Sequence, residues 1–178
     1  MSSEEQTLNE KSSEIKAGLF LTFALGEEMY GLEILAVQEI IQMAPITVVP
    51  RTPEFVRGVI NLRGKVIPVI DLRKKFEMET IEDTEHSCII VVEVGSNRQP
   101  VIMGIVVDQV AEVLNVANDQ VEPPPVFGTT VDTDFIQGMG KVHNKVIILL
   151  DIRRVLGGEE LAMVNQMIQK DNEQEKSN

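Results

Sequence analysis

Alternation of apolar and polar residues predicts two similar hairpins, one near the start of the chain and one in the middle. In residues 19–25, large apolar side chains recur at every second position, which is the period of a β-strand. The Gly-Glu-Glu run at 26–28 is typical of a turn, and residues 29–34 have the composition of a returning strand. Residues 89–94 and 101–107 repeat this hairpin around a longer turn. The pattern therefore predicts a chain dominated by β-structure.

The sequence also contains an internal repeat. Residues 31–41 align with residues 104–114 at an offset of 73, and glycine, the central valine and the following glutamate coincide. Residues 52–76 align with residues 132–156 at an offset of 80, with seven identities in 25 positions and no gap. The two offsets differ by seven residues, so a single insertion separates the aligned blocks. Such self-similarity indicates a duplicated structural unit.

Turn and capping residues occupy equivalent places in the two copies. Each copy has a second hairpin, whose tip is Arg63-Gly64 in the first copy and His143-Asn144 in the second. Glycine and asparagine tolerate the positive φ angles that a two-residue hairpin turn requires. Asp71 and Asp151 each follow an apolar strand and precede a short helical pattern, which predicts two helix N-caps.

Each copy thus offers about five short strands, enough to close a small barrel with few exposed edges. We expect a mainly β fold of two five-stranded barrels related by a pseudo-twofold axis, with short helical turns. Residues 159–169 carry apolar side chains on one helical face and predict an amphipathic C-terminal helix that docks on the barrels. The expected boundaries are a disordered tail at 1–17, a double-barrel domain at 18–158 with repeat units of about 19–80 and 88–157, and a C-terminal helix with a flexible tail at 159–178, disordered from about residue 171.

Composition narrows the classes of function. The formal net charge is −12, whereas nucleic-acid-binding domains are usually basic, so binding to nucleic acid or to an anionic membrane surface is not expected. The polar first 16 residues do not resemble a signal peptide, and no run of about 20 apolar residues predicts a transmembrane helix. Cys88 is the single cysteine and lies in an apolar run, which favours core packing in a reducing cytoplasm.

Catalytic and metal-binding patterns are not evident in the sequence. His86 and Cys88 are two residues apart, but no second ligand pair follows at a spacing suited to zinc. His143 lies at a predicted hairpin tip, and Gly138-Met139-Gly140-Lys141 lacks parts of a phosphate-binding loop. We therefore expect a non-enzymatic protein without metal or cofactor. An enzyme of an unrecognised type remains the rival class, and a deep pocket with shifted carboxylate pKa values would be its signature.

One segment is basic within this acidic chain. Residues 51–75 contain seven lysines and arginines against Glu54 and Asp71. These cations are either solvated charge that keeps the hairpin soluble or a face that pairs with acidic groups of a partner. Glu39 lies in an apolar run and needs a cationic partner if it is buried. We hypothesise that Glu39 pairs with Arg63, either within the domain or across an interface.

Three segments closely resemble the CheW family of bacterial chemotaxis coupling proteins. They are residues 30–40, residues 52–64 with the Asn-Leu-Arg-Gly tip, and residues 67–73, and the likeness extends through residues 104–113. The resemblance covers roughly residues 18–165. It implies two SH3-like barrels and a scaffold that bridges the cytoplasmic tips of chemoreceptors to the regulatory domain of the histidine kinase CheA. It also implies a cytoplasmic protein recruited to membrane-bound receptor arrays.

The resemblance further implies two binding surfaces. The kinase-facing residues would be Val37, Glu39, Arg63 and Val66, and the receptor-facing residues would be Arg57, Gly58, Val110 and Val113. His143-Asn144 departs from the Arg-Gly tip of the first copy, so the two barrels are not expected to bind the same partner interchangeably. An adaptor that links a different receptor and kinase in another signalling pathway remains the alternative.

Overall fold

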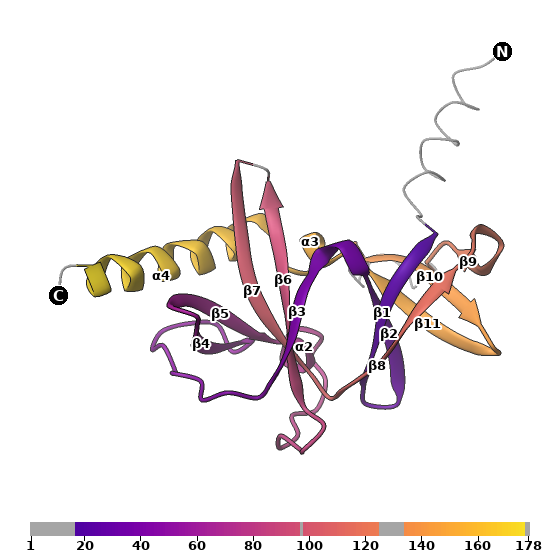
Figure 1. Cartoon of the computed structure of the whole chain (residues 1–178), viewed down its shortest axis with the longest axis horizontal. Coiled ribbons are helices and arrows are strands. Elements are labelled where there is room, and N and C mark those ends of the chain that lie inside the picture. The colour runs from indigo at the N-terminus through magenta and orange to yellow at the C-terminus, as the bar shows by residue number, and fades with distance from the viewer. Residues whose placement is uncertain (1–16, 97, 125–133, 177–178) are drawn as a thin grey trace, which may run out of the picture.

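The computed structural model describes residues 17–96, 98–124 and 134–176, and its strands form two sheets (Figure 1). Sheet A is six-stranded, with the order β8-β1-β2-β11-β10-β9, and sheet B is five-stranded, with the order β3-β6-β7-β5-β4. The predicted disordered tail at 1–17 lies almost wholly outside the described residues. The predicted mainly β class is confirmed. The strands are β1 (Gly18–Leu25), β2 (Glu28–Glu33), β3 (Val37–Gln42), β4 (Val56–Leu62), β5 (Lys65–Asp71), β6 (Cys88–Ser96), β7 (Gln99–Val107), β8 (Gln109–Val116), β9 (Val121–Glu122), β10 (Ile136–Val142) and β11 (Lys145–Leu150).

The helices are short, with one exception. Asp71 and Asp151 cap α2 and α3, where each carboxylate accepts a backbone N–H, from Lys74 and Arg153 respectively, so both predicted N-caps are confirmed. The C-terminal helix continues beyond its predicted end at residue 169, because its polar end consists largely of residues with favourable helix propensity. The helical elements are η1 (Ile34–Ala36), α2 (Leu72–Lys75), η2 (Asn118–Gln120), α3 (Ile152–Val155) and α4 (Gly158–Lys176).

The two sheets repeat one topology but exchange hairpins. Five strands of sheet A have the same order as the five strands of sheet B. The order β8-β1-β2-β11-β10 in sheet A corresponds, strand by strand, to β3-β6-β7-β5-β4 in sheet B. Both sheets also contain one parallel pair, β11 with β2 and β5 with β7. The expectation that each copy closes its own barrel is wrong, because each sheet takes its first hairpin from one copy and its remaining strands from the other.

Each sheet curls until the chain leaving one edge reaches the opposite edge. In sheet B, Thr47 follows the edge strand β3 and exchanges two backbone hydrogen bonds of 2.9 Å with Val59 on β4. In sheet A, the edge strand β8 leads through η2 to β9, which pairs with β10. The same device therefore brings the two edges together in both sheets, as closure into a small barrel requires.

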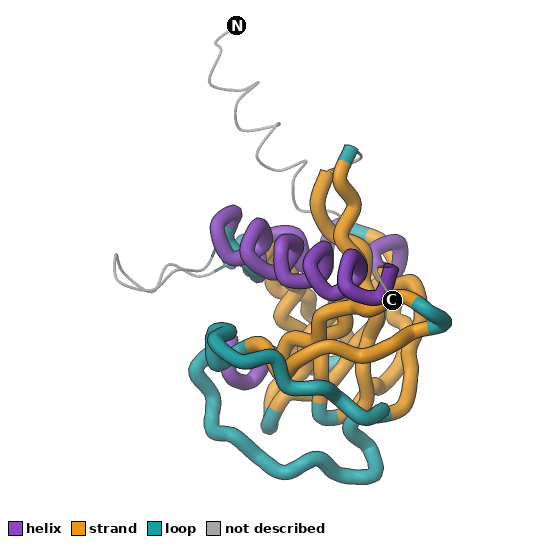
Figure 2. Tube along the Cα trace, turned by 90° about the vertical axis from the view of Figure 1, so that its left-hand side faces the viewer, coloured by secondary structure: helices purple, strands orange, loops and turns teal. Residues whose placement is uncertain are grey.

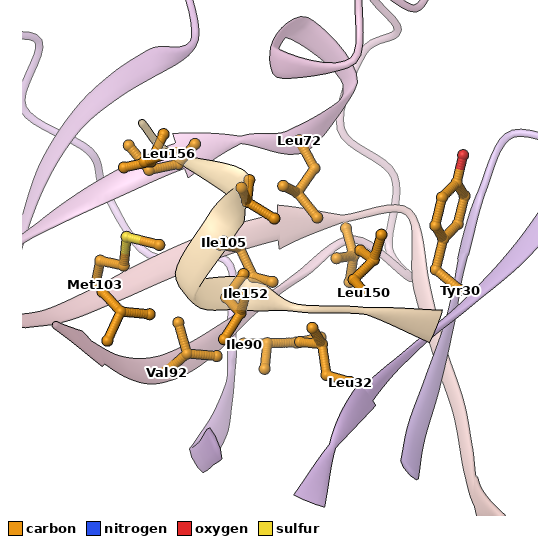
Figure 3. Packing of buried hydrophobic residues seen from close by; sticks show 14 of the residues in the cluster. Tyr30, Leu32, Leu72, Ile90, Val92, Met103, Ile105, Leu150, Ile152 and Leu156 are labelled. Carbon is orange, nitrogen blue, oxygen red and sulfur yellow. The ribbon is translucent and has the colours of Figure 1, made fainter. Parts of the chain in front are cut away.

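One hydrophobic core joins the sheets. Its largest cluster includes Leu32 and Leu150 from sheet A together with Ile90 and Ile105 from sheet B, and all four are at most 1% exposed (Figure 3). Val164 on α4 also enters this cluster, and Figure 2 shows α4 lying across the strands. A smaller cluster lies within each sheet. The two halves thus depend on a shared interior as well as on exchanged strands.

Candidate protein-interaction surfaces

Glu39 and Arg63 form an ion pair between the two edges of sheet B. Arg63 occupies the β4–β5 tip with φ of 51°, and Gly64 follows with φ of 86° and donates its N–H to Asn61 Oδ1 at 2.9 Å. Arg63 Nη1 donates to Glu39 Oε2 at 3.2 Å, and Arg63 Nη2 donates to Glu39 Oε1. The side chains are 73% and 28% exposed. The intramolecular form of the hypothesised pair is confirmed, and the fork geometry fixes the orientation of both groups.

Most of the basic segment is already paired within the chain. Beyond Arg63, three of its cations bind acids that lie far away in the sequence. The structure therefore assigns at least four of the seven basic residues to internal contacts, rather than to one free basic face. These three pairs are Arg57 with Asp83 at 2.8 and 3.0 Å, Arg73 with Asp108 and Lys75 with Glu160 at 2.7 Å.

The Arg73–Asp108 pair lies at a crossing between the sheets. Arg73 Nε donates to Asp108 Oδ1 at 2.7 Å, and the Gly26 N–H donates to Asp108 Oδ2 at 2.8 Å. Burial by itself raises the pKa of Asp108, but the hydrogen bonds from Arg73 and Gly26 outweigh burial and hold that pKa below its usual value. The hydrogen bond to Asp108 raises the pKa of Arg73. This pair links α2 to the tip of the β1–β2 hairpin.

The other predicted kinase-facing residues differ in exposure. Val37 begins β3 and is half-buried against the shared core. Val66 is the second residue of the return strand β5 after the Arg63-Gly64 tip and is only 8% exposed. The structure thus brings Glu39, Arg63 and Val66 to the β4–β5 hairpin and the edge strand beside it, while most of Val66 is covered within the chain.

The predicted receptor-facing residues come from both sheets. Arg57 and Gly58 lie at the start of β4 in sheet B, and Gly58 is buried with φ of 145°. A Cβ at Gly58 would lie 2.1 Å from the carbonyl oxygen of Thr47, so glycine is needed for sheet closure itself. Val110 and Val113 lie on the edge strand β8, where Val110 is half-buried and Val113 is 46% exposed.

Sequence reasoning missed the exposure of some apolar residues. Leu35 was part of an apolar run typical of core, yet 95% of it is exposed on η1. Val146 is 48% exposed, although its counterpart Val66 is buried. The internal repeat could have indicated the exposure of Leu35, because it aligns Leu35 with Asp108. A position that is polar in the other copy need not lie in the core.

The structure also bears on other classes of function. Within the described ranges, no group of three or more His, Cys, Asp or Glu side chains could hold a metal ion. Over the same ranges, no helix has both the length and the apolar character needed to cross a bilayer. The Asp108 carboxylate has a lowered pKa within a structural ion pair, the opposite of the raised pKa that an acid–base catalyst often shows.

Comparison with known proteins places the chain in a family. A family model of the CheW-like domain matches residues 19–160. The chemotaxis protein CheW of Klebsiella aerogenes is 38% identical over 161 residues, covering 90% of this chain and 95% of that protein. The CheW of Treponema pallidum is 32% identical, with coverage of 79% and 83%. The crystal structure of the scaffolding protein TtCheW from Thermoanaerobacter tengcongensis is similar with a TM-score of 0.71 at 40% identity, and covers 82% of this chain and 96% of that one. With the sequence and the fold in agreement, this chain belongs to the CheW-like domain family.

Proposed function

We propose that this protein is a non-enzymatic chemotaxis scaffold that couples chemoreceptor tips to the histidine kinase CheA. The observation that carries the proposal is the match to CheW proteins across residues 19–160, together with an exposed Glu39–Arg63 pair at one end of sheet B. Relatives of similar length bear the name chemotaxis protein CheW, and one similar structure is described as a scaffolding protein. Coupling of this kind requires binding surfaces and no catalytic group.

The kinase would dock on the end of sheet B. Val37 offers apolar surface beside Glu39, and the Arg63 guanidinium keeps donors available in its exposed fork. Apolar anchors within a polar rim are typical of such protein interfaces. Val66 would then act mainly by supporting the tip from inside, since it is buried.

The receptor would use the second surface. A receptor tip is a helical hairpin in this proposal, and the exposed Val113 with half-buried Val110 offers apolar contact to one face of a helix. Gly58 would hold the backbone of β4 in place, and Arg57 would contribute only if its two hydrogen bonds to Asp83 were kept or exchanged. The protein would act in the cytoplasm, at membrane-bound receptor arrays.

Titration with the isolated CheA regulatory domain tests the proposal. We expect wild-type protein to bind, and Arg63→Glu to weaken binding at least about tenfold because it places a second carboxylate against Glu39. Lys65→Glu is the matched control, since Lys65 lies on the same hairpin and no ion pair of the described residues involves it. Absence of wild-type binding to this domain, with binding to another kinase in a pull-down, would favour an adaptor of a different signalling pathway.

A further inference from the structure

A small pocket lies where the chain crosses between the sheets, outside the residues assigned above to either partner. It encloses about 210 Å³ between the end of β2, η1, β6 and the junction of β11 with α3. Figure 1 shows the arch from β2 to β3 passing beside α3 at this place. We call it the η1 pocket. Its lining includes one exposed leucine and four charged residues, namely Leu35, Glu33, Glu93, Asp151 and Arg153.

Leu35 on the rim of this pocket is exposed to an unusual degree. It is 95% exposed, more than any other large apolar residue of the described chain, and η1 buries none of its residues. A single exposed leucine is common on protein surfaces. An exposed leucine at the rim of a charged pocket, however, offers a partner an apolar contact directly beside polar groups, and protein interfaces combine apolar contact with a polar rim in this way.

The internal repeat shows how the equivalent crossing is closed. The repeat sets Leu35 against Asp108 and Arg153 against Arg73. At the Asp108 crossing, the carboxylate holds both Arg73 and the Gly26 N–H. Leucine cannot accept a hydrogen bond. Among the described residues the ion pair of the Arg153 side chain is with Asp151, at 3.4 Å, and Arg153 stays 63% exposed. The Asp108 crossing is therefore locked, in the sense that an ion pair and a hydrogen bond of the chain itself hold it. The Leu35 crossing lacks these contacts and is called the open crossing.

The charges of the open crossing select the kind of group that would fill it. The lining has three carboxylates and one guanidinium, a balance of −2. Asp151 is already in contact with Arg153 and Arg154. Glu93 accepts Gln38 Nε2 at 3.1 Å, and within the part of the chain that the structure describes neither Glu33 nor Glu93 has an ion pair. These two carboxylates favour a cationic occupant.

We propose that the η1 pocket receives a lysine or arginine, with an adjoining apolar side chain on Leu35, from the protein that docks on β3. The pocket adjoins that strand, because Ala36 of the lining directly precedes β3 and the side chain of Gln38 on β3 donates to Glu93 of the lining. In the proposed function the protein that docks on β3 is the kinase, and the inference rests on that function. The pocket would widen the kinase contact beyond the end of sheet B.

Titration of the full chain with the isolated CheA regulatory domain tests the apolar part of the inference. Leu35→Ala is expected to weaken binding about tenfold, because it removes the apolar contact without adding a charge that could pair with Arg153, and to leave the thermal transition unchanged because the side chain is exposed. Val48→Ala is the matched control, since Val48 is 76% exposed outside the proposed kinase surface and should bind as wild type does. Wild-type affinity of Leu35→Ala would overturn the inference and leave the proposed function intact. No binding of the wild type would overturn both.

Charge variants test the occupant. A Glu33→Gln, Glu93→Gln double variant is expected to lose about fivefold in affinity and to show a weaker salt dependence, whereas Arg153→Gln, which makes the lining more negative, should bind at least as tightly as wild type. The opposite result, loss with Arg153→Gln alone, would indicate a carboxylate in the pocket and overturn the cationic assignment. Repeating the series with a receptor fragment identifies the partner, because loss confined to the receptor would overturn the kinase assignment.

Discussion

Sheet A and sheet B share one strand order, yet the chain covers equivalent positions of the two sheets very differently. Sheet B has Glu39 paired with Arg63 at its tip, and α4 lies against its strand β5. At the equivalent tip of sheet A, Glu112 and His143 are both exposed, and no ion pair joins them among the described residues. Duplication has thus kept the strand order and the core, while the exposed ends have diverged toward different contacts.

The closure of sheet B gives the largest expected effect. Gly58→Ala should destabilise the fold by about 3 kcal/mol or more, because the new Cβ would meet the Thr47 carbonyl oxygen and β4 would have to shift. Gly64→Ala is the control, since Gly64 also has positive φ but no atom lies within 4 Å of the place that a Cβ would take there. It should cost about 1 kcal/mol in chemical denaturation. Equal losses would show that backbone strain, and not closure, explains the requirement for glycine at 58.

The next largest effect concerns the free energy of unfolding and compares Arg73, which follows β5, with Arg153, which follows the equivalent strand β11. Arg73 is 12% exposed and Arg153 is 63% exposed. Arg73→Gln should lower the free energy of unfolding by about 2–3 kcal/mol, because it leaves the Asp108 carboxylate partly buried without its cation. Arg153→Gln should change it by less than about 0.5 kcal/mol, as is usual for an exposed pair. Equal effects in urea unfolding would contradict the view that only one crossing is locked.

The lowered pKa of Asp108 adds a pH dependence to this comparison. A carboxyl whose pKa is lower in the folded state stabilises the fold above its unfolded pKa, about 3.9, and this contribution is lost as the pH falls through the lower folded value. The stability difference between wild type and Arg73→Gln should therefore be complete at pH 6 and should shrink below about pH 4. A difference that stayed constant down to pH 3 would show that the Asp108 charge is not its source.

Val113 and its counterpart Ile40 test whether the edge strands have separate partners. They are 46% and 45% exposed, on β8 and β3. Val113→Asp should weaken receptor-fragment binding by about 2 kcal/mol or more, because it places an unpaired charge in an apolar contact, and folding should be largely unaffected. Ile40→Asp should leave receptor binding unchanged. Normal receptor affinity of Val113→Asp would refute the receptor assignment of β8.

The sequence predicted the strands and helices of the fold better than it predicted which strands lie side by side. Alternation and turn residues located the hairpins, and the repeat identified Asp71 and Asp151 as equivalent caps, because these features depend on local backbone geometry. A period of two tells which face of a strand is apolar but not which strand lies beside it, so the exchange of hairpins could not be read from it. The Glu39–Arg63 pair was predictable because an acid in an apolar run demands a cation.

The exposure of individual side chains was predicted least well. Leu35 belongs to an apolar run, and only the course of the chain between the sheets turns it outward. The pairs of Arg57 and Arg73 join residues 26 and 35 positions apart, across loops whose paths no local pattern fixes. Side-chain partners at such separations depend on the three-dimensional course of the chain. Charge counts along the sequence therefore could not distinguish ion pairs within the chain from a free basic face.

The smallest effect concerns the face of β5 that α4 covers. Because side chains alternate along a strand, Val66 shares a face with Ile70, which packs in the cluster that contains Val164 of α4. Its counterpart Val146 lies on β11, which has no comparable contact with α4 in the described chain, and is 48% exposed against 8% for Val66. Val66→Ala should therefore cost about 1.5 kcal/mol of unfolding free energy, and Val146→Ala less than about 0.5 kcal/mol. If both substitutions were neutral in urea unfolding, burial of Val66 would contribute little, and its role would have to be sought in the kinase contact alone.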